Sequence, residues 1–187
     1  MKLYHFTPDV EHYGYIEFVE KYTHEAGFPI SGQFHLGQSI VSSWQPVAVK
    51  SNTLRGELGD FPRALVGPPV FSERAWDVLG PLLGEAVEAL PIITPSGPYL
   101  AINVLKVISC LDYSCSDLTW YPKEMMRGGL HRIIKYCFNP APISGHPIFK
   151  IPEEMTRTII SEEVEASIKD ASLKGLNFSQ CLFETGD

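Results

Sequence analysis

The chain has 187 residues, of which 15 are basic and 22 acidic, and its formal net charge is −7. Apolar residues make up 44% and charged residues 20%, which is typical of a globular protein with its own hydrophobic core and excludes a disordered chain. The acidic balance argues against nucleic acid or an anionic membrane surface as the main partner, because both are bound through Lys and Arg.

The first sixty residues predict short elements separated by Gly and Pro. Residues 1–7 are expected to form a strand ahead of Pro8. A helix is favoured within residues 11–28 by the helical spacing of four apolar side chains, those of Tyr15, Phe18, Val19 and Tyr22. Residues 29–46 are rich in Gly, Ser and Pro and predict a loop, which leads into a strand near 47–50.

The pattern becomes sharper from residue 69 onward. Ser72 is expected to begin a helix, because its hydroxyl can accept a hydrogen bond from a free backbone N–H, and Glu73 suits the positive end of the helix dipole. Gly80-Pro81 should interrupt or bend this helix. The β-branched residues of the apolar run 99–111 favour a strand, although its polar residues recur at every third position and would also suit a helix. Further strands are predicted at 87–93, 132–138 and 147–151.

The same order of signals returns near the C-terminus. A strand over 158–160 leads into Ser161-Glu162 and a second helix, which Gly175 is expected to end. The two strand–helix units are either a faint internal repeat or a product of general capping rules. The elements together predict an α+β fold with a mixed or antiparallel sheet and a few short helices, in a single compact domain spanning residues 1–187.

A search of the sequence finds no catalytic or metal-binding motif. The chain lacks a phosphate-binding Gly-rich loop, a dinucleotide fingerprint and a Gly-x-Ser-x-Gly elbow. Its six histidines are scattered, and four residues separate Cys110 from Cys115, so zinc-ligand spacing is missing. We therefore expect no catalytic residue, no metal and no cofactor. The alternative is a small hydrolase that pairs Cys137 with His131 or His146, but on one straight strand positions 131 and 137 would lie about 20 Å apart.

The N-terminal sequence predicts the cellular compartment and, through it, the redox state of the cysteines. The N-terminus has no long apolar run of the kind found in a signal peptide, and no stretch approaches the roughly 18 apolar residues of a membrane span. We therefore expect a cytoplasmic protein with reduced thiols at all four cysteines, which are Cys110, Cys115, Cys137 and Cys181.

The segment after the apolar run is the best candidate for a partner-binding surface. It combines acids with aromatics and ends at Pro122, and we predict that its contact residues are Asp112, Tyr113, Asp117, Trp120 and Tyr121. Aromatic side chains that lie outside regular elements are typical anchors of protein interfaces. Trp44 lies in another loop and is a second candidate anchor. Packing of each tryptophan under its own loop would explain the pattern equally well.

A series of short segments in fixed order also resembles a known family. These segments are Val70-Phe71-Ser72-Glu73, Pro98-Tyr99-Leu100, Asn103-Val104-Leu105, Cys110-Leu111-Asp112, Gly145-His146-Pro147-Ile148-Phe149, Ile159-Ile160-Ser161-Glu162 and Leu173-Lys174-Gly175-Leu176-Asn177-Phe178. The series is similar to an immunity-protein family of bacterial polymorphic toxin systems, typified by a myxobacterial immunity protein and formerly a domain of unknown function. The resemblance covers residues 61–178, and residues 1–60 match only loosely.

The resemblance implies a protein that is not an enzyme and that binds and neutralises a cognate toxin delivered by a neighbouring cell. Family membership brings no catalytic residues with it, in agreement with the motif search. The net charge of −7 suits a basic toxin, such as a nuclease, because opposite fields speed association. The sequence leaves open whether the protein forms homo-oligomers.

Overall fold

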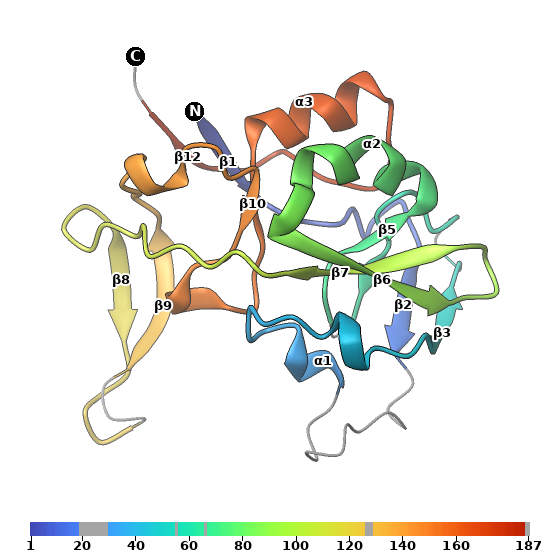
Figure 1. Ribbon diagram of the computed structural model, residues 1–187. Coiled ribbons are helices and arrows are strands. Elements are labelled where there is room, and N and C mark those ends of the chain that lie inside the picture. The colour runs from blue at the N-terminus through green and yellow to red at the C-terminus, as the bar shows by residue number, and fades with distance from the viewer. Residues whose placement is uncertain (19–29, 55, 66, 126–128, 186–187) are drawn as a thin grey trace.

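The computed structural model describes residues 1–18, 30–54, 56–65, 67–125 and 129–185 (Figure 1). The strands are β1 (Lys2–His5), β2 (Tyr15–Phe18), β3 (Val47–Asn52), β4 (Arg63–Ala64), β5 (Val70–Ser72), β6 (Val87–Ile93), β7 (Tyr99–Val104), β8 (Asp117–Trp120), β9 (Leu130–Lys135), β10 (Ile148–Phe149), β11 (Ile159–Ser161) and β12 (Cys181–Glu184). The α-helices are α1 (Ile30–Gln33), α2 (Glu73–Leu83) and α3 (Glu162–Asp170), and the 3₁₀ turns are η1 (Val41–Ser43), η2 (Gly84–Ala86), η4 (Ala141–Ile143) and η5 (Pro152–Glu154).

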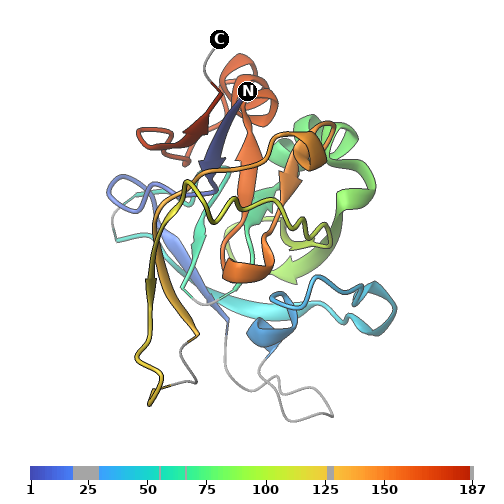
Figure 2. The same cartoon turned by 90° about the vertical axis from the view of Figure 1, so that its left-hand side faces the viewer.

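The strands form three sheets in one compact α+β domain, which confirms the predicted fold class. A 6-stranded sheet has the order β4-β2-β3-β6-β7-β5, and it is mixed because β2 and β4, and also β3 and β6, run parallel. A 4-stranded antiparallel sheet has the order β10-β11-β1-β12, and β8 pairs only with β9. Helices α2 and α3 lie side by side over the sheets, and both termini emerge near α3 (Figures 1 and 2).

The run 99–111 forms a strand only in its first half, as β7. The six-stranded sheet is covered on both faces: Ile102 and Val104 pack with α2, whereas Ala101 packs against the opposite cluster. A strand buried on both faces needs no alternation of polar residues. Its one polar side chain, that of Asn103, is fully buried and donates hydrogen bonds to Gln38 O at 2.8 Å and to Glu88 Oε2 at 3.0 Å. The spacing of polar residues is therefore no sign of a helix.

The helix expected within residues 11–28 is wrong for the part that the structure describes. Tyr15–Phe18 forms β2, in which Ile16 is fully buried and Glu17 is exposed, as the two-residue period of a strand requires. Pairing with β3 and β4 on its two sides decides this local choice. Residues 19–29, which include Val19 and Tyr22, lie outside the described residues. The predicted loop over 29–46 contains the short helix α1 and the 3₁₀ turn η1.

Both predicted helices form, but neither ends as expected. Ser72 begins α2 by accepting from the backbone N of Ala75 at 3.1 Å, and the helix continues through Pro81 to Leu83 without interruption. Helix α3 already ends at Asp170, and Ser172, not Gly175, adopts the left-handed conformation next to that end, with φ of 52°. The N–H of Leu173 bonds Ile168 O and the N–H of Ser172 bonds Lys169 O, the Schellman pattern.

Two buried polar contacts hold the N-terminal third against the rest of the domain. Glu88 accepts from the backbone N of Ile40 at 3.0 Å, so the Asn103–Glu88 pair fixes the chain around η1 on β6 and β7. The Lys150 ammonium is buried and donates to Phe34 O, at the end of α1. Burial lowers the pKa of Lys150 to about 8. Residues 1–60 are therefore integrated into the core through α1 and η1.

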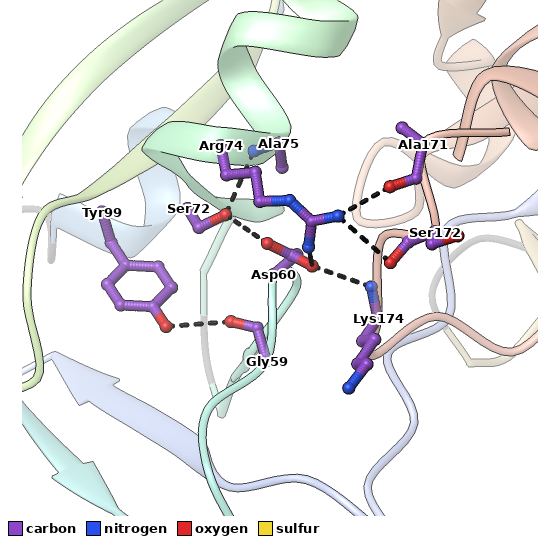
Figure 3. A network of polar contacts seen from close by, with 9 residues as sticks. All are labelled: Gly59, Asp60, Ser72, Arg74, Ala75, Tyr99, Ala171, Ser172 and Lys174. Carbon is purple, nitrogen blue, oxygen red and sulfur yellow. Dashed lines mark hydrogen bonds and ion pairs between the residues drawn. The ribbon is translucent and has the colours of Figure 1, made fainter. Parts of the chain in front are cut away.

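Asp60 links the end of β5 and the start of α2 to the turn after α3 (Figure 3). Its carboxylate accepts hydrogen bonds from Ser72 Oγ at 2.7 Å, from Arg74 Nη1 at 3.2 Å and from the backbone N of Lys174 at 2.8 Å. Its own backbone N donates to Lys174 O, and its carbonyl accepts from the N of Ser72. Arg74 continues the network by donating to Ala171 O at 2.6 Å. One buried carboxylate thus accepts from three donors in two segments, the start of α2 and the turn after α3.

We expect Asp60→Asn to lower the free energy of unfolding by about 2–4 kcal/mol. An amide offers one acceptor oxygen, so its NH₂ group would face a donor that the carboxylate now accepts from. Most of the loss should come from the Ser72 and Lys174 bonds, because the half-exposed Arg74 is screened by solvent. Urea denaturation measures the effect. The control is Glu57→Gln, a change at an exposed neighbouring carboxylate, which should cost less than about 0.5 kcal/mol. Equal losses in both variants would contradict the role given to Asp60.

Candidate partner-binding surface

The β8–β9 hairpin projects from the body of the molecule, beside the four-stranded sheet (Figures 1 and 2). One of its faces is anchored: Leu118 and Ile133 pair across the hairpin and pack into a cluster with Phe138 and Phe149. The bulges beside Leu118 and Trp120 offset the two strands. Trp120 and Ile134 on the hairpin remain more than half exposed.

Tyr113 and Trp120 form a stacked aromatic pair on the hairpin, with ring centroids 6.4 Å apart and an interplanar angle of 22°. Both are about half exposed, at 51% for Tyr113 and 54% for Trp120. The Tyr113 hydroxyl donates to Glu153 Oε1 at 2.7 Å, and this hydrogen bond raises the pKa of Tyr113. The pair is therefore held in one orientation while its faces stay accessible, which lowers the entropy cost of using it in an interface.

Further apolar and aromatic side chains extend the patch along the hairpin. Tyr121 lies against the His131 ring, with centroids 4.3 Å apart. Met125 and Ile134 are exposed by 57% and 56%. Aromatic residues and Met are enriched in protein interfaces, and exposed apolar groups gathered on one element mark interaction sites. We call the exposed side chains of Tyr113, Trp120, Tyr121, Met125, His131 and Ile134 the hairpin patch.

A cavity of about 270 Å³ opens beside the hairpin patch, between β9 and the turn at η5. Its lining includes His131, Arg132, Glu153 and Glu154. Oε2 of Glu153 is buried and has no hydrogen-bond partner in the part of the chain that the structure describes. Glu154 is already engaged, by Arg157 Nε at 3.0 Å and by the Tyr136 hydroxyl. The lining of this cavity therefore holds one buried carboxylate oxygen without a partner in the described residues.

The two predicted aspartates have different roles. Asp112 accepts from the backbone N of Ser114 at 2.9 Å and from Ser114 Oγ at 2.6 Å, and these bonds lower the pKa of its carboxyl. It stabilises the turn that carries Tyr113. Asp117 is exposed and lies opposite Lys135 in the β8–β9 ladder. The loop expected around Trp120 is wrong, because Asp117–Trp120 is the strand β8.

The structure does not bring Trp44 to the hairpin. Its indole N–H donates to Pro91 O at 2.9 Å, and its ring packs edge-on against Phe34, with centroids 5.7 Å apart. Trp44 belongs to the cluster on the far face of the six-stranded sheet. Sequence reasoning missed Glu153, Met125, His131 and Ile134 as parts of the candidate surface. Nothing in the sequence connects Glu153 with Tyr113, which precedes it by 40 residues.

The expectation of four reduced cysteines is wrong for one pair. Cys115 and Cys137 form a disulfide across a sequence separation of 22 residues. It joins the turn that carries Tyr113 to the chain after β9, where Asp112 N also donates to Cys137 O at 2.8 Å. The hairpin folds these two segments together, which the spacing of the cysteines could not reveal. Cys110 and Cys181 are free.

The cysteines do not form a nucleophilic site. Cys137, the thiol considered for a hydrolase, is bonded to Cys115 and cannot attack a substrate in this form. Cys110 is buried, and burial raises the pKa of its thiol to about 12. Within the described residues, no group of three or more His, Cys, Asp or Glu side chains could hold a metal ion. No helix in the described ranges is long and apolar enough to cross a membrane.

The immunity protein family (Imm11) matches the chain over residues 45–182, which includes the hairpin, α2 and α3. A search of curated proteins finds no match.

We expect the double variant Cys115→Ser/Cys137→Ser to be less stable than the oxidised protein by about 3 kcal/mol, because a loop of this length gains freedom in the unfolded chain. Guanidinium denaturation with and without a reductant measures it. Reduction should lower the midpoint of the natural chain and leave that of the double variant unchanged. Cys181→Ser, at an exposed free thiol, is the control. If the oxidised natural chain unfolded at the same midpoint as the double variant, the disulfide would not have the stabilising role that we give it.

Proposed function

Because the chain belongs to the immunity protein family (Imm11), we propose that it binds a cognate bacterial toxin and neutralises it, so protecting the cell that produces it. An immunity role follows from the family. Binding of one particular toxin, as part of a polymorphic toxin system used in competition between bacteria, is the further step. The observation that carries this step is the projecting hairpin with its exposed aromatic side chains.

The hairpin patch supports the proposal through its geometry. Interface hot spots are aromatic side chains in well-packed surroundings that pair with groups on the partner. Trp120 and Tyr113 offer such a pair, fixed in advance by the bond to Glu153 and by the turn that Asp112 stabilises. Among the residues chosen from the sequence, we retain Asp112, Tyr113, Asp117, Trp120 and Tyr121 as the proposed surface. Trp44 is half-buried and already bonded, so we give it no role in binding.

Charge supports a basic partner. The chain carries a net charge of −7, which would steer a basic toxin, such as a nuclease, toward it and raise the association rate. The free Oε2 of Glu153 would accept a hydrogen bond from a Lys or Arg side chain of such a toxin. Neutralisation in this proposal requires no chemical step by the immunity protein. The hydrolase alternative would need Cys137 as a free thiol, whereas in this structure Cys137 is bonded to Cys115.

We propose the cytoplasm as the place of protection, since a delivered toxin acts inside the cell. The Cys115–Cys137 disulfide bears on this point, because disulfides persist in oxidising compartments and are rare in a reducing cytoplasm. The oxidation state of this pair in living cells therefore reports the compartment in which the protein is kept.

A cytoplasmic protein should carry Cys115 and Cys137 as thiols in the cell and form the disulfide only after lysis. Trapping thiols with a maleimide in acid-quenched cells, followed by mass spectrometry, measures this. Cys181 is exposed and should be labelled in any reducing compartment, which makes it the internal control. A pair found fully oxidised in quenched cells would contradict a cytoplasmic location and favour an oxidising compartment.

We expect Trp120→Ala to weaken toxin binding by at least about thirty-fold, because truncating a hot-spot aromatic costs about 2 kcal/mol or more. The toxin is taken from the gene next to that of this protein, and calorimetry measures its affinity. The matched control is Leu54→Ala, which also truncates an exposed apolar side chain and lies at 92% exposure in the turn after β3. The control should bind like the natural chain, and both variants should keep its unfolding midpoint.

The two parts of the proposal fail separately. A toxin that stays fully active with a saturating amount of this protein would contradict neutralisation. A toxin that is neutralised equally well by the Trp120→Ala variant would contradict the assignment of the hairpin patch and leave neutralisation standing.

A further inference from the structure

A second cavity lies where the end of β1 passes β4, and Thr156 lines both it and the cavity beside the hairpin patch. Its volume is about 380 Å³, within the range of roughly 300–1,000 Å³ that small-molecule sites occupy. Three stretches of chain enclose it: residues 5–10, residues 62–69 around β4, and residues 156–158 ahead of β11. We call it the arginine cavity, because Arg63 and Arg157 both line it.

Hydrogen-bond donors dominate the polar part of this lining. Besides the two arginines, it includes three threonines, which are Thr7, Thr156 and Thr158, and also His5, whose Nε2 is already engaged by the Tyr136 hydroxyl. None of the described residues that line the cavity is an Asp or a Glu. The chain as a whole is acidic, with 22 acidic and 15 basic residues. The lining of this cavity is basic, because it has two arginines and, among its described residues, no carboxylate.

Both arginines have guanidinium nitrogens that make no hydrogen bond or ion pair in the described part of the chain. Arg157 uses Nε to pair with Glu154 at 3.0 Å, and its two terminal nitrogens have no hydrogen bond or ion pair within the described part of the chain. The side chain of Arg63 is exposed and likewise makes none there. A guanidinium fork that is free at its end is the group that binds carboxylate and phosphate in two-point fashion.

His5 lies near Arg157 in this lining. Burial, with a smaller contribution from the charge of Arg157, lowers the pKa of His5 to about 4. His5 is neutral at physiological pH, and its Nε2 lies 3.1 Å from the Tyr136 hydroxyl.

The rest of the wall is apolar and rigid. Phe6 lies in it and stacks on Phe71, with centroids 5.7 Å apart, and four prolines also line it, namely Pro8, Pro62, Pro68 and Pro69. Proline and a packed aromatic ring lose little freedom when a ligand binds, so the cavity is largely pre-formed. Its shape and chemistry combine an apolar floor with donors at the rim.

We infer that the arginine cavity binds an oxyanion, a carboxylate or a phosphate, carried on a small apolar body. Arg63 and Arg157 hold the anionic oxygens, the threonine hydroxyls donate to them, and Phe6 and the prolines contact the apolar part. This site does not depend on toxin neutralisation. Its anion comes from one of two sources, a free small molecule or an acidic side chain of the bound toxin.

The test uses the full chain and three probes of equal shape: benzoate, phenyl phosphate and the neutral benzyl alcohol. We expect saturable shifts of the backbone amide signals of Thr7, Gly67 and Thr156 in NMR titrations with the two anions at constant ionic strength. Benzyl alcohol should bind at least about ten-fold more weakly, because it lacks the charge that the guanidinium groups recognise. Equal binding of the alcohol, or shifts that grow linearly without saturation, would overturn the inference.

Variants test the two arginines separately. Arg63→Gln should raise the dissociation constant of benzoate about ten-fold, and Arg63→Gln/Arg157→Gln should abolish saturable binding. Arg63 makes no described side-chain contact, so its variant keeps the fold even if Arg157→Gln disturbs Glu154. The matched control is Lys174→Gln, which removes an exposed basic side chain lining a different cavity. An Arg63→Gln protein that binds benzoate as tightly as the control would overturn the inference.

The source of the anion is read from a competition experiment. If benzoate and the purified toxin exclude one another, and the double arginine variant weakens toxin binding, the cavity receives an acidic side chain of the toxin. If toxin binding is unaffected by either, the cavity serves a free small anion. Both results uphold the site, which fails only through the probe titrations.

Discussion

The buried carboxylate of Asp60 is the contact on which the arrangement of this domain depends. A charge removed from water is tolerated only when its lone pairs are filled, and Asp60 fills them with donors from Ser72, Arg74 and Lys174. These donors belong to the beginning of α2 and to the turn after α3, so α2 and α3 are locked together and onto the chain that precedes β5 (Figure 3). The turn after α3 leads on to residues 175–177, which bond the segment that follows β1.

A body locked in this way can carry a projecting element without losing its shape. The β8–β9 hairpin depends on its own anchors, a shared apolar cluster below and the Cys115–Cys137 disulfide at its base. The stacked pair of Tyr113 and Trp120 stays half exposed beside these anchors. The two candidate sites differ in chemistry: the hairpin patch is aromatic with a free carboxylate oxygen beside it, whereas the arginine cavity is a donor-rich hollow. A partner could contact the first without occupying the second.

Several features could be predicted from the sequence because they depend on local rules. The α+β class, most strands and the start of α2 at Ser72 follow from periodicity and from capping, in which a hydroxyl satisfies a backbone N–H three residues away. The family resemblance also came from residues close together in the chain. The predictions were wrong where contacts between distant segments decide the local structure. Tyr15–Phe18, for example, is a strand because β3 and β4 flank it.

The sequence by itself determined the class of the fold, the acidic charge, the family and the aromatic segment that forms β8. Only the tertiary structure decided that Cys115 meets Cys137, that Glu153 holds Tyr113, and that Arg63 and Arg157 share one cavity. The physical reason is range. Propensity, capping and periodicity act within a few residues, whereas each of these contacts joins positions tens of residues apart that come together only when the sheets pair and the core closes.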